Sequence, residues 1–406
     1  MRILVTCNRY PGLPLDGETL RIYHYARHLG RHHELDLVCL ADDSARDPEI
    51  EALFKHIQRF PRPAPDSPNS ALSRLAAGLD PRRLFPSSPE MQAYLKEMAA
   101  GDRYDLIWDA GCYLLSNLAE IRRTVPLIAD QIDDSFLALL RSLRVADSLY
   151  GRLWYVKQMG LQWLFQFWHL RNAEAILFVS DKDAASFRRF LPFLKPHVIE
   201  NGVDDRFFCP GKQPDPAAAD AAIEIVFEGS MFFAPNVDAA RYFVETIFPL
   251  IRQAIHGVRF TIVGRDPAPE VRALACNDVF VTGSVADVRP YLERAHVFVC
   301  PMRSGAGIKN KILQAWAMGK AIVSTTAGVG SLKTAEGRNI LIRDTPEEFA
   351  AAVVGLLRDP EKAARLGEAG RRTIESHYTW AAKASALEAL MQQIVDQRRA
   401  LARRTA

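Results

Sequence analysis

Residues 297–319, VFVCPMRSGAGIKNKILQAWAMG, place a short apolar run, a glycine-bearing turn and an amphipathic segment in immediate succession. The run Val297–Cys300 is typical of a strand that is buried on both faces of a parallel sheet. The segment from about Ile308 to Met318 predicts a helix, and Gly319 suits its C-terminal cap because glycine adopts left-handed backbone angles at little cost. The stretch therefore predicts the strand–loop–helix unit from which parallel α/β sheets are built.

The same alternation runs through both halves of the chain. In the first half we expect strands at Ile3–Thr6, Leu35–Leu40, Leu106–Trp108, Leu127–Ala129 and Ile176–Val179. In the second half we expect strands at Ile223–Phe227, Phe260–Val263, Val279–Thr282, Val297–Cys300 and Ile322–Ser324. Amphipathic segments at about 19–29, 136–172 and 237–255 predict helices between the strands, the second of them as one helix or two.

A stretch rich in proline and glycine, Asp205–Ala222, separates the two halves and reads as a linker. A chain of 406 residues is too long for one ordinary core and suits two domains of roughly 150–200 residues. The expected fold class is therefore α/β, with two Rossmann-like, doubly wound domains in tandem. We set the domains at 1–205 and 206–378, and we expect residues 379–406 to form a helix that crosses back to the first domain.

The composition excludes several classes of protein. A formal net charge of +3 is too small to argue for nucleic acid as a partner. The six cysteines are scattered, with no Cys-x-x-Cys pair, which favours reduced thiols in a cytoplasmic protein over a disulfide frame or a zinc site. The apolar run after Met1 is too short for a signal peptide, and no stretch reaches the roughly 18–20 apolar residues that span a bilayer. We therefore expect a cytoplasmic protein whose only possible contact with a membrane is peripheral.

Three loops of the second half follow strands, and open α/β sheets bind ligands beyond the carboxyl ends of their strands. The first loop runs from Gly229 and Ser230 to Asn236, which we expect to be the N-cap of the next helix. The free amides at such a helix start suit a diphosphate. An ordinary capped helix explains the same residues, and this alternative stays open.

The second loop carries Gly305 and Gly307, which allow a ligand to approach the backbone closely. Arg303 and Lys309 add whole positive charges at the place where the following helix contributes its dipole. The loop therefore predicts an anion site, with a solvent-facing basic loop as the alternative.

The third loop contains Ser284 and Val285, whose backbone groups suit the edge of a nucleobase. Taken alone, this loop is also explained as a simple turn after a strand.

The motifs together resemble those of the family 4 retaining glycosyltransferases. The resemblance rests on Glu200-Asn-Gly-Val-Asp204, Gly229-Ser230, Val263-Gly264-Arg265, Val281-Thr-Gly283 and the segment Gly305–Gly319. It covers nearly the whole chain and is densest after residue 176. The forms PNVDA, VGRDPAP, VTGSVADVRPYL and GIKNKIL are similar to those of bacterial sugar transferases of exopolysaccharide loci.

The resemblance implies a GT-B fold whose two domains face a central cleft, and an enzyme of the hexosyltransferase type that needs no metal ion and no cofactor. The sugar of a UDP- or GDP-sugar would pass to a polysaccharide or lipid-linked acceptor, at the inner face of the cytoplasmic membrane. Lys309 and Arg303 would stabilise the leaving diphosphate, and Gln314 would contact the donor ribose. The implied donor residues are Gly229, Ser230, Arg265, Ser284, Val285, Gly305, Gly307, Ile308, Asn310 and Gln314, and the implied acceptor-side residues are Gly17, Asp109 and Asp133.

The chain also departs from the family pattern. Many relatives carry two glutamates where this chain has Ala306 and Gln314, and an arginine and a lysine in the loop that here spans residues 230–236. A neutral amide binds a ribose hydroxyl more weakly than a carboxylate does. Two alternatives therefore stay open: a GT-B scaffold or nucleotide-binding protein without transfer activity, and a nucleotide-sugar epimerase.

Three further segments have two interpretations each. Ser180-Asp-Lys-Asp183 is better explained as a capped helix start than as a metal-binding carboxylate pair. Asp130, Asp133 and Asp134 either orient a sugar hydroxyl or are plain loop carboxylates. The aromatic and basic segment Leu149–Arg171 either contacts a membrane interface or packs as a buried helix on the sheet.

Overall fold

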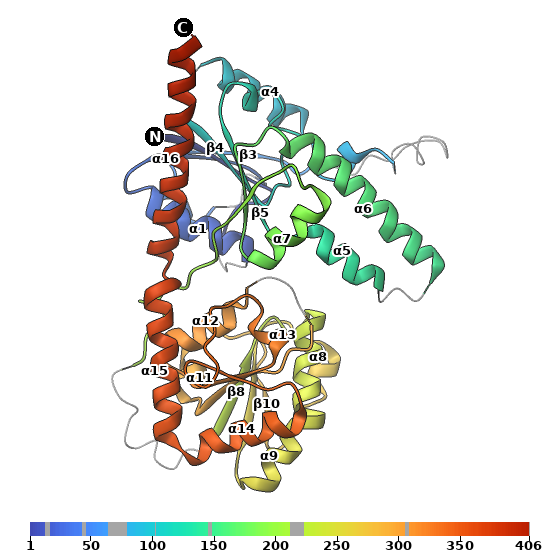
Figure 1. The fold of residues 1–406 in the computed structure, drawn as a ribbon, viewed down its shortest axis with the longest axis vertical. Helices are drawn as coiled ribbons and strands as arrows, with labels where there is room; N and C mark the ends of the chain where they lie inside the picture. Colours follow the sequence, from blue (N-terminus) through green and yellow to red (C-terminus); the bar gives the residue numbers. More distant parts are fainter. Residues whose placement is uncertain are drawn as a thin grey trace. The chain divides into compact units, whose positions relative to one another are not determined.

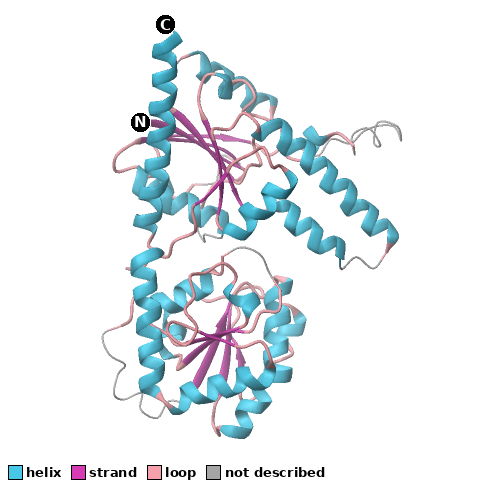
Figure 2. Cartoon of the chain, viewed as in Figure 1, coloured by secondary structure: helices cyan, strands magenta, loops and turns pink. Residues whose placement is uncertain are grey.

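The structure is a computed structural model that describes residues 1–12, 17–42, 46–63, 79–101, 103–144, 148–211, 223–304 and 308–405. It divides into two compact units, one formed by Met1–Glu200 with Lys383–Ala406 and the other by Asn201–Ala382. Each unit is built around one parallel sheet, with helices packed on its faces (Figures 1 and 2).

The first unit holds a seven-stranded sheet with the order β3-β2-β1-β4-β5-β6-β7. Its strands are β1 (Arg2–Cys7), β2 (Glu34–Leu40), β3 (His56–Phe60), β4 (Leu106–Ala110), β5 (Leu127–Ile132), β6 (Ala175–Phe178) and β7 (Pro196–Val198). The chain moves outward from β1 to β3, then returns to the other side of β1 and continues from β4 to β7. The switch point of this doubly wound sheet therefore lies between β1 and β4.

Helices of the first unit begin where the sequence supplies an N-cap. Ser88, Ser148 and Ser180 each accept a hydrogen bond from the backbone amide three residues further on, which confirms the predicted cap at Ser180. The helices of this unit are α1 (Gly17–Leu29), α2 (Pro48–Glu51), α4 (Pro89–Ala100), α5 (Ser135–Arg144), α6 (Leu149–Leu170) and α7 (Asp181–Phe190), with short 3-10 turns at Pro81–Arg83 and Ile121–Arg123.

The last helix, α16 (Trp380–Thr405), belongs to the first unit from Lys383 onward. The ammonium group of Lys383 lies 2.5 Å from a carboxylate oxygen of Glu200, and both side chains are mostly buried. Nearer the end of the helix, a guanidinium nitrogen of Arg399 lies 2.6 Å from Asp105. Two ion pairs at widely separated points thus hold α16 against the body of this unit.

The second unit holds a six-stranded sheet with the order β10-β9-β8-β11-β12-β13. Its strands are β8 (Glu224–Glu228), β9 (Arg259–Val263), β10 (Val279–Val281), β11 (Val297–Cys300), β12 (Ile322–Ser324) and β13 (Leu341–Ile342). Its helices are α8 (Ala234–Tyr242), a π-helical turn (Phe243–Ile247), α9 (Phe248–Ala254), α10 (Pro269–Arg272), α11 (Arg289–Arg294), α12 (Asn310–Ala317), α13 (Thr326–Val329), α14 (Pro346–Arg358) and α15 (Pro360–His377). The switch point lies between β8 and β11.

Trp316 shows how tightly the second unit packs. Its indole nitrogen donates a hydrogen bond of 2.7 Å to the carbonyl oxygen of Asn339, and its side chain is fully buried. A Cβ atom added to Gly370 of α15 would lie 2.2 Å from the indole ring. Glycine at 370 therefore lets α15 press directly on α12, and this contact fixes the position of the helix that follows the glycine-bearing loop.

The two doubly wound parallel sheets confirm the predicted fold class. The β12 and β11 strands have the predicted bounds, and Gly319 follows α12 with a φ of 67°, as expected of a C-terminal cap. The sequence analysis did not predict three edge strands, β3, β7 and β13, because their apolar pattern is short or interrupted. The predicted helical segment 136–172 is two helices, α5 and α6.

One cap was predicted wrongly. The helix α8 begins at Ala234 after Phe233, so Asn236 lies inside its first turn and not at the N-cap. Pro235 explains the difference, because proline is favoured at the first positions of a helix, where its missing amide costs no hydrogen bond. The side chain of Asn236 is consequently free to serve another purpose.

Candidate functional site

The switch point of the second unit brings together the loops that follow β8 and β11. The loop after β8 leads into α8 and the loop after β11 leads into α12, so they diverge at the carboxyl edge of the sheet. In doubly wound sheets this divergence leaves a crevice in which ligands bind. The side chains that meet at this edge form the candidate donor site.

Lys311 occupies the first turn of α12 and reaches back to the loop after β8. Its ammonium nitrogen donates a hydrogen bond of 2.8 Å to the side-chain oxygen of Asn236 and lies 4.3 Å from the ring centre of Phe227. The side-chain nitrogen of Asn236 in turn donates to the carbonyl oxygen of Ser230 at 3.0 Å. Asn236 therefore connects the β8 loop to the cation on α12.

Glycine is required at the point where these groups meet. A Cβ atom on Gly229 would lie 2.7 Å from the side-chain nitrogens of both Asn236 and Lys311. A Cβ atom on Gly264, which follows β9, would lie 1.7 Å from the carbonyl oxygen of Gly229. The two loops are also joined by a 2.9 Å hydrogen bond from the amide of Met231 to the carbonyl oxygen of Arg265. The edge of the sheet is thus a closely packed backbone surface.

Lys311 has a lower pKa than an ordinary lysine. Burial lowers the pKa of Lys311, whose charge is partly sustained by the nearby Cys300 and Glu228 groups. Burial likewise raises the pKa of Glu228, the last residue of β8, against the attraction of Lys311. The ammonium group of Lys311 donates its hydrogen bond to the neutral amide of Asn236, and it forms no ion pair with a carboxylate among the described residues.

The start of α12 adds two further polar groups. Lys309 is the residue before the helix and is only 7% exposed. The side-chain oxygen of Asn310 is buried and accepts no hydrogen bond from the part of the chain that the structure describes. With the positive end of the helix dipole, these groups make an anion-binding edge that also offers an acceptor to a hydroxyl.

The other predicted donor residues are distributed around this edge. Arg303 is exposed, forms an ion pair with Asp238 and lies 4.7 Å from the ring centre of Tyr242, so its charge is already partly compensated. The guanidinium of Arg265 lies 5.8 Å from the ring of Phe232. The remaining residues are Ile308, half-buried before α12; Gln314, half-buried on α12; and Ser284 and Val285, exposed and half-buried after β10. Gly305 and Gly307 lie outside the described residues.

Lys311 was missed by the sequence analysis. The signal was present, since Lys309 and Lys311 are neighbours in the same loop–helix stretch. Only the rotation of α12 decides that Lys311 points to the β8 loop.

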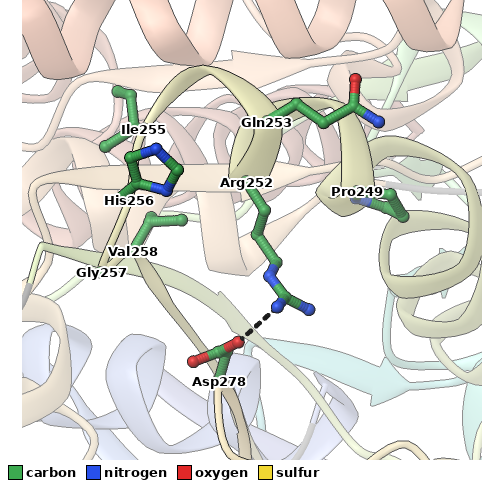
Figure 3. Close-up of a pocket in the computed structure, with 8 residues that line it drawn as sticks. All are labelled: Pro249, Arg252, Gln253, Ile255, His256, Gly257, Val258 and Asp278. Carbon is green, nitrogen blue, oxygen red and sulfur yellow. Dashed lines mark ion pairs between the residues drawn. The ribbon is translucent and has the colours of Figure 1, made fainter.

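A cavity of about 410 Å³ lies elsewhere in the second unit (Figure 3). It is lined at one side by Val258, which precedes β9, and by Asp278, which precedes β10, with Arg252 in an ion pair of 2.9 Å to Asp278. These residues belong to the amino ends of the strands, opposite the switch point. The cavity is therefore not part of the candidate donor site.

The first unit has a cavity of about 350 Å³ beside the carboxyl ends of β4 and β5. Its walls combine carboxylates, amides and aromatic rings, a mixture that suits the hydroxyls and apolar faces of a sugar. The lining residues are Glu18, Phe85, Gly111, Cys112, Tyr113, Gln131, Ile132, Asp133, Asp134, Ser135, Gln162 and Phe165.

Three of the lining residues have left-handed backbone conformations. Gly111 has a φ of 87°, Cys112 of 60° and Ile132 of 65°. For a β-branched residue such as Ile132 this conformation costs about 1–3 kcal/mol and persists only where the surroundings enforce it. The carbonyl oxygen of Ile132 accepts a 2.9 Å hydrogen bond from the amide of Val179, which ties the strained residue to the end of β6. Strain of this kind gathers at binding sites.

The predicted acceptor-side residues do not all lie at the cavity. Asp133 lines the cavity and is exposed, and Gly17 is the first residue of α1. Asp109 was expected to follow a strand, but it lies inside β4 and is fully buried, because β4 extends two residues further than predicted. Its carboxyl accepts a 2.5 Å hydrogen bond from the hydroxyl of Thr6. Desolvation raises the pKa of Asp109 to about 8, so the group is largely protonated at neutral pH.

The two neighbours of Asp133 have structural roles. Asp130 is fully buried, and its carboxylate lies 2.7 Å from the guanidinium of Arg21. Asp134 accepts a hydrogen bond of 3.0 Å from the amide of Phe136 and so caps α5. Of the three carboxylates whose role was open, only Asp133 is an exposed side chain on the cavity wall.

Comparison with known proteins matches each half of the chain to a family. Residues 16–207 match the family described as "Glycosyltransferase Family 4", and residues 222–359 match the family described as "Glycosyl transferases group 1". The chain belongs to glycosyltransferase family 4. As an enzyme of this family it transfers a sugar from a nucleotide sugar.

Curated relatives of this glycosyltransferase include two mycobacterial enzymes. It is 25% identical over 426 residues to an alpha-maltose-1-phosphate synthase of Mycolicibacterium smegmatis, covering 94% of this chain and 96% of the relative. It is 28% identical over 235 residues to a GDP-mannose-dependent alpha-(1-6)-phosphatidylinositol monomannoside mannosyltransferase of Mycobacterium tuberculosis, covering 52% of this chain and 59% of the relative.

Solved structures of similar fold cover nearly the whole glycosyltransferase. A sucrose-phosphate synthase from Thermosynechococcus elongatus has a TM-score of 0.69 at 18% identity, covering 98% of this chain and 99% of that one. The Anabaena protein HepE in complex with UDP and glucose has a TM-score of 0.64 at 16% identity, covering 96% and 99%. At these identities the likeness concerns the GT-B fold alone.

Proposed function

We propose that this glycosyltransferase holds the diphosphate of a UDP- or GDP-sugar at the carboxyl edge of the second unit's sheet. The observation that carries the proposal is the connection of Lys311 through Asn236 to the loop after β8, beside Lys309 and the start of α12. The sugar passes, with retention of configuration and without a metal ion, to a hydroxyl of a polysaccharide or lipid-linked acceptor held by the first unit.

The leaving diphosphate develops negative charge as the bond to the sugar breaks. Fixed cations and helix amides stabilise such charge without reorganising during the reaction. Lys309 and Lys311 supply the cations, and the dipole of α12 adds partial charge, so the site does not depend on a metal ion. Arg303 contributes less to stabilising the diphosphate than the sequence suggested, because it already forms an ion pair with Asp238.

The nucleoside is recognised by the residues around this edge. Gly229 and Ser230 offer backbone groups to the phosphates, Arg265 flanks them, and the ribose contacts Gln314. Ser284 and Val285 offer backbone groups to the nucleobase. The nucleobase is uracil or guanine, as in the UDP-bound HepE and the GDP-mannose-dependent relative.

The acceptor binds in the cavity of the first unit. Its wall includes the carboxylates of Glu18 and Asp133, and no arginine, lysine or histidine lines it within the described ranges. Glu18 lies 3.9 Å from the guanidinium of Arg9, which offsets part of its charge. The carboxylate of Asp133 would repel a phosphate or carboxylate on the acceptor, whereas sugar hydroxyls donate hydrogen bonds to carboxylates. The acceptor group that enters the cavity is therefore an uncharged sugar, and aromatic rings such as Phe85 and Phe165 pack on its apolar face.

An acceptor of this kind suits the assembly of cell-surface polysaccharide or glycolipid at the inner face of the cytoplasmic membrane. The similarity of several motifs to sugar transferases of exopolysaccharide loci supports this role. The lipid named in the mannosyltransferase relative supports it independently.

Titration calorimetry with UDP, GDP and ADP tests the donor half of the proposal. We expect UDP or GDP to bind with micromolar affinity and ADP to bind more weakly. Lys309→Ala should lower turnover by about 10²–10³-fold, as expected for loss of one group that stabilises developing charge, with folding retained. Absence of binding for all three nucleotides would instead favour the scaffold alternative.

The acceptor half requires a separate measurement. Transfer to a neutral glycoside should exceed transfer to the same sugar carrying a phosphate. The anomeric configuration of the product, followed by NMR, tests retention. Product formed from the donor alone, with no acceptor present, would point to the epimerase alternative.

A further inference from the structure

The outward side of α6 carries large apolar residues. The side chains that form it, exposed by between 42% and 79%, are Leu149, Tyr150, Leu153, Trp154, Val156, Leu164 and Trp168. We refer to these seven residues as the α6 outer face. At about 100° per residue these positions fall within one half of the helix circumference, so they lie on one side of the helix. Figure 1 shows α6 beside α5, the two forming a pair that extends from the sheet of the first unit.

The inward side of the same helix is partly polar. Gln162 and Gln166 are buried, and their side-chain nitrogens donate hydrogen bonds of 2.9 and 3.1 Å to the hydroxyl oxygen of Ser135. These two bonds fix the rotation of α6 relative to α5. Leu161, Phe165 and Leu170 are buried on the same inward side. The helix thus has an ordinary buried side and, unlike most surface helices, also leaves tryptophan, tyrosine and leucine exposed.

Basic residues outnumber acidic ones in the sequence of α5 and α6. Between residues 135 and 173 the basic residues are Arg141, Arg144, Arg152, Lys157 and Arg171, and the one carboxylate is Asp147, which lies outside the described residues. The guanidinium of Arg171 lies 4.7 Å from the ring of Trp168. Exposed tryptophan and tyrosine beside cations are typical of protein surfaces that lie in the headgroup region of a bilayer.

We propose that the α6 outer face docks the protein on the surface of a bilayer that contains anionic lipids. The apolar side chains enter the headgroup–acyl boundary, and Arg152, Lys157 and Arg171 contact the lipid phosphates. No helix among the described residues is long and apolar enough to cross a membrane, so α6 lies along the surface. A second copy of this chain is a less suitable occupant, because the basic residues would repel their counterparts.

The same helix also borders the candidate acceptor cavity. Gln162 and Phe165 line that cavity, while Leu164 and Trp168 lie on the α6 outer face. One helix would therefore contact lipid with one side and the acceptor with the other. This part of the inference rests on the proposed function and specifies a lipid-linked acceptor, whereas the docking itself does not depend on it.

Vesicle flotation without sugar donor tests the docking. The full chain should float with vesicles of phosphatidylethanolamine and phosphatidylglycerol, and should bind vesicles of phosphatidylcholine more weakly. The double variant Leu153→Glu with Val156→Glu should weaken binding at least about tenfold, because two apolar side chains no longer enter the lipid. Arg152→Gln should weaken binding about fivefold, as expected for one basic residue near an anionic surface.

Phe280→Glu provides the matched control. It places an acid at an exposed aromatic position, 40% exposed, on β10 of the other unit. This variant should float like the wild-type chain. A thermal melt by circular dichroism that is unchanged in the double variant assigns its loss of binding to the surface and not to misfolding.

Three outcomes would overturn the proposal. The first is wild-type chain that stays unbound on the anionic vesicles at low salt, and the second is equal flotation of the double variant and the wild type. The third is a dimer, measured by light scattering, that the double variant abolishes while vesicle binding is absent, since this would show that a second copy covers the face. Donor calorimetry on the double variant keeps the two proposals apart, because nucleotide binding should persist whether or not docking fails.

Discussion

The ammonium group of Lys311 and the side-chain oxygen of Asn236 are joined by a 2.8 Å hydrogen bond between residues 75 positions apart in the chain. The bond connects the first turns of α8 and α12, the helices that follow β8 and β11, the two strands at the switch point of the second sheet. Because Asn236 also binds the carbonyl oxygen of Ser230, movement of either segment changes the place of the cation. The positive charge that we propose to stabilise the leaving group therefore belongs to Lys311, and contacts between distant segments, rather than the local loop, set its position.

Replacement of Lys311 by methionine should abolish most of the activity. Lys311→Met keeps the size of the half-buried side chain but removes its charge, so kcat/KM should fall about 10²–10³-fold. The melting temperature should change little, because a charge whose pKa is lowered by desolvation contributes no net stability. Lys333→Met, at an exposed lysine of the same unit, is the control and should retain wild-type kinetics. Similar losses in both variants would refute the assignment.

Two glycine substitutions should separate binding from stability. In Gly229→Ala the new methyl group meets only the flexible ends of Asn236 and Lys311, so the strain of a side chain at a φ of 157° should lower the unfolding free energy by about 1 kcal/mol, while donor affinity drops about tenfold or more. In Gly264→Ala the methyl group meets the backbone oxygen of Gly229 at 1.7 Å, and unfolding should become easier by about 2–3 kcal/mol. Urea denaturation and nucleotide titration of both variants measure the contrast. Equal destabilisation by the two changes would contradict the described packing.

Asp109 should give the protein a stability that depends on pH. Burial raises its pKa in the folded protein to about 8 from its ordinary value of 3.8, so between these pH values the folded state holds a proton that the unfolded state has lost. The contribution of Asp109 is therefore fully present below pH 3.8 and is lost as the pH rises towards 8. Between these two pH values, Asp109 lowers the unfolding free energy by about 1.4 kcal/mol for each unit by which the pH rises.

Asp109→Asn isolates this effect, because the amide does not titrate. The difference in unfolding free energy between the wild type and the variant should shrink steadily as the pH rises, when both are measured by urea denaturation at several pH values. A difference that stays constant with pH would mean that Asp109 is ionised in the folded protein. Other titrating groups are common to both proteins and cancel in the comparison.

Substitution of Asp133 should lower the activity towards the acceptor without changing the affinity for the donor. Asp133→Asn replaces a charged hydrogen-bond acceptor on the cavity wall, so kcat/KM for the acceptor should fall about 10–100-fold. The dissociation constant for the nucleotide should stay as in the wild type. Asp181→Asn removes an exposed carboxylate in the first turn of α7 and serves as the control. A change in nucleotide affinity with unchanged acceptor kinetics would place Asp133 in a different role.

Much of this protein could be predicted before its structure, because the signals are local. Apolar runs such as Val297–Cys300, the cap at Ser180 and the terminating Gly319 each depend on a few consecutive residues. Together they determined two doubly wound sheets, and the motifs around Gly229 and Lys309 pointed to glycosyltransferase family 4. Edge strands such as β13 were missed, since two residues carry too little pattern to stand out.

The charges of the site were decided by tertiary structure. Arg303 and Lys311 are both cations close to one loop, yet Arg303 is paired with Asp238, 65 positions away, whereas Lys311 is half-buried against Phe227 and Asn236. The exposed aromatic residues of α6 are a similar case, since only the bonds from Gln162 and Gln166 to Ser135 settle which side of the helix faces out. Local sequence determines where a helix or strand forms. The neighbours and solvent that a side chain meets depend on packing between distant segments, and these set its charge, pKa and exposure.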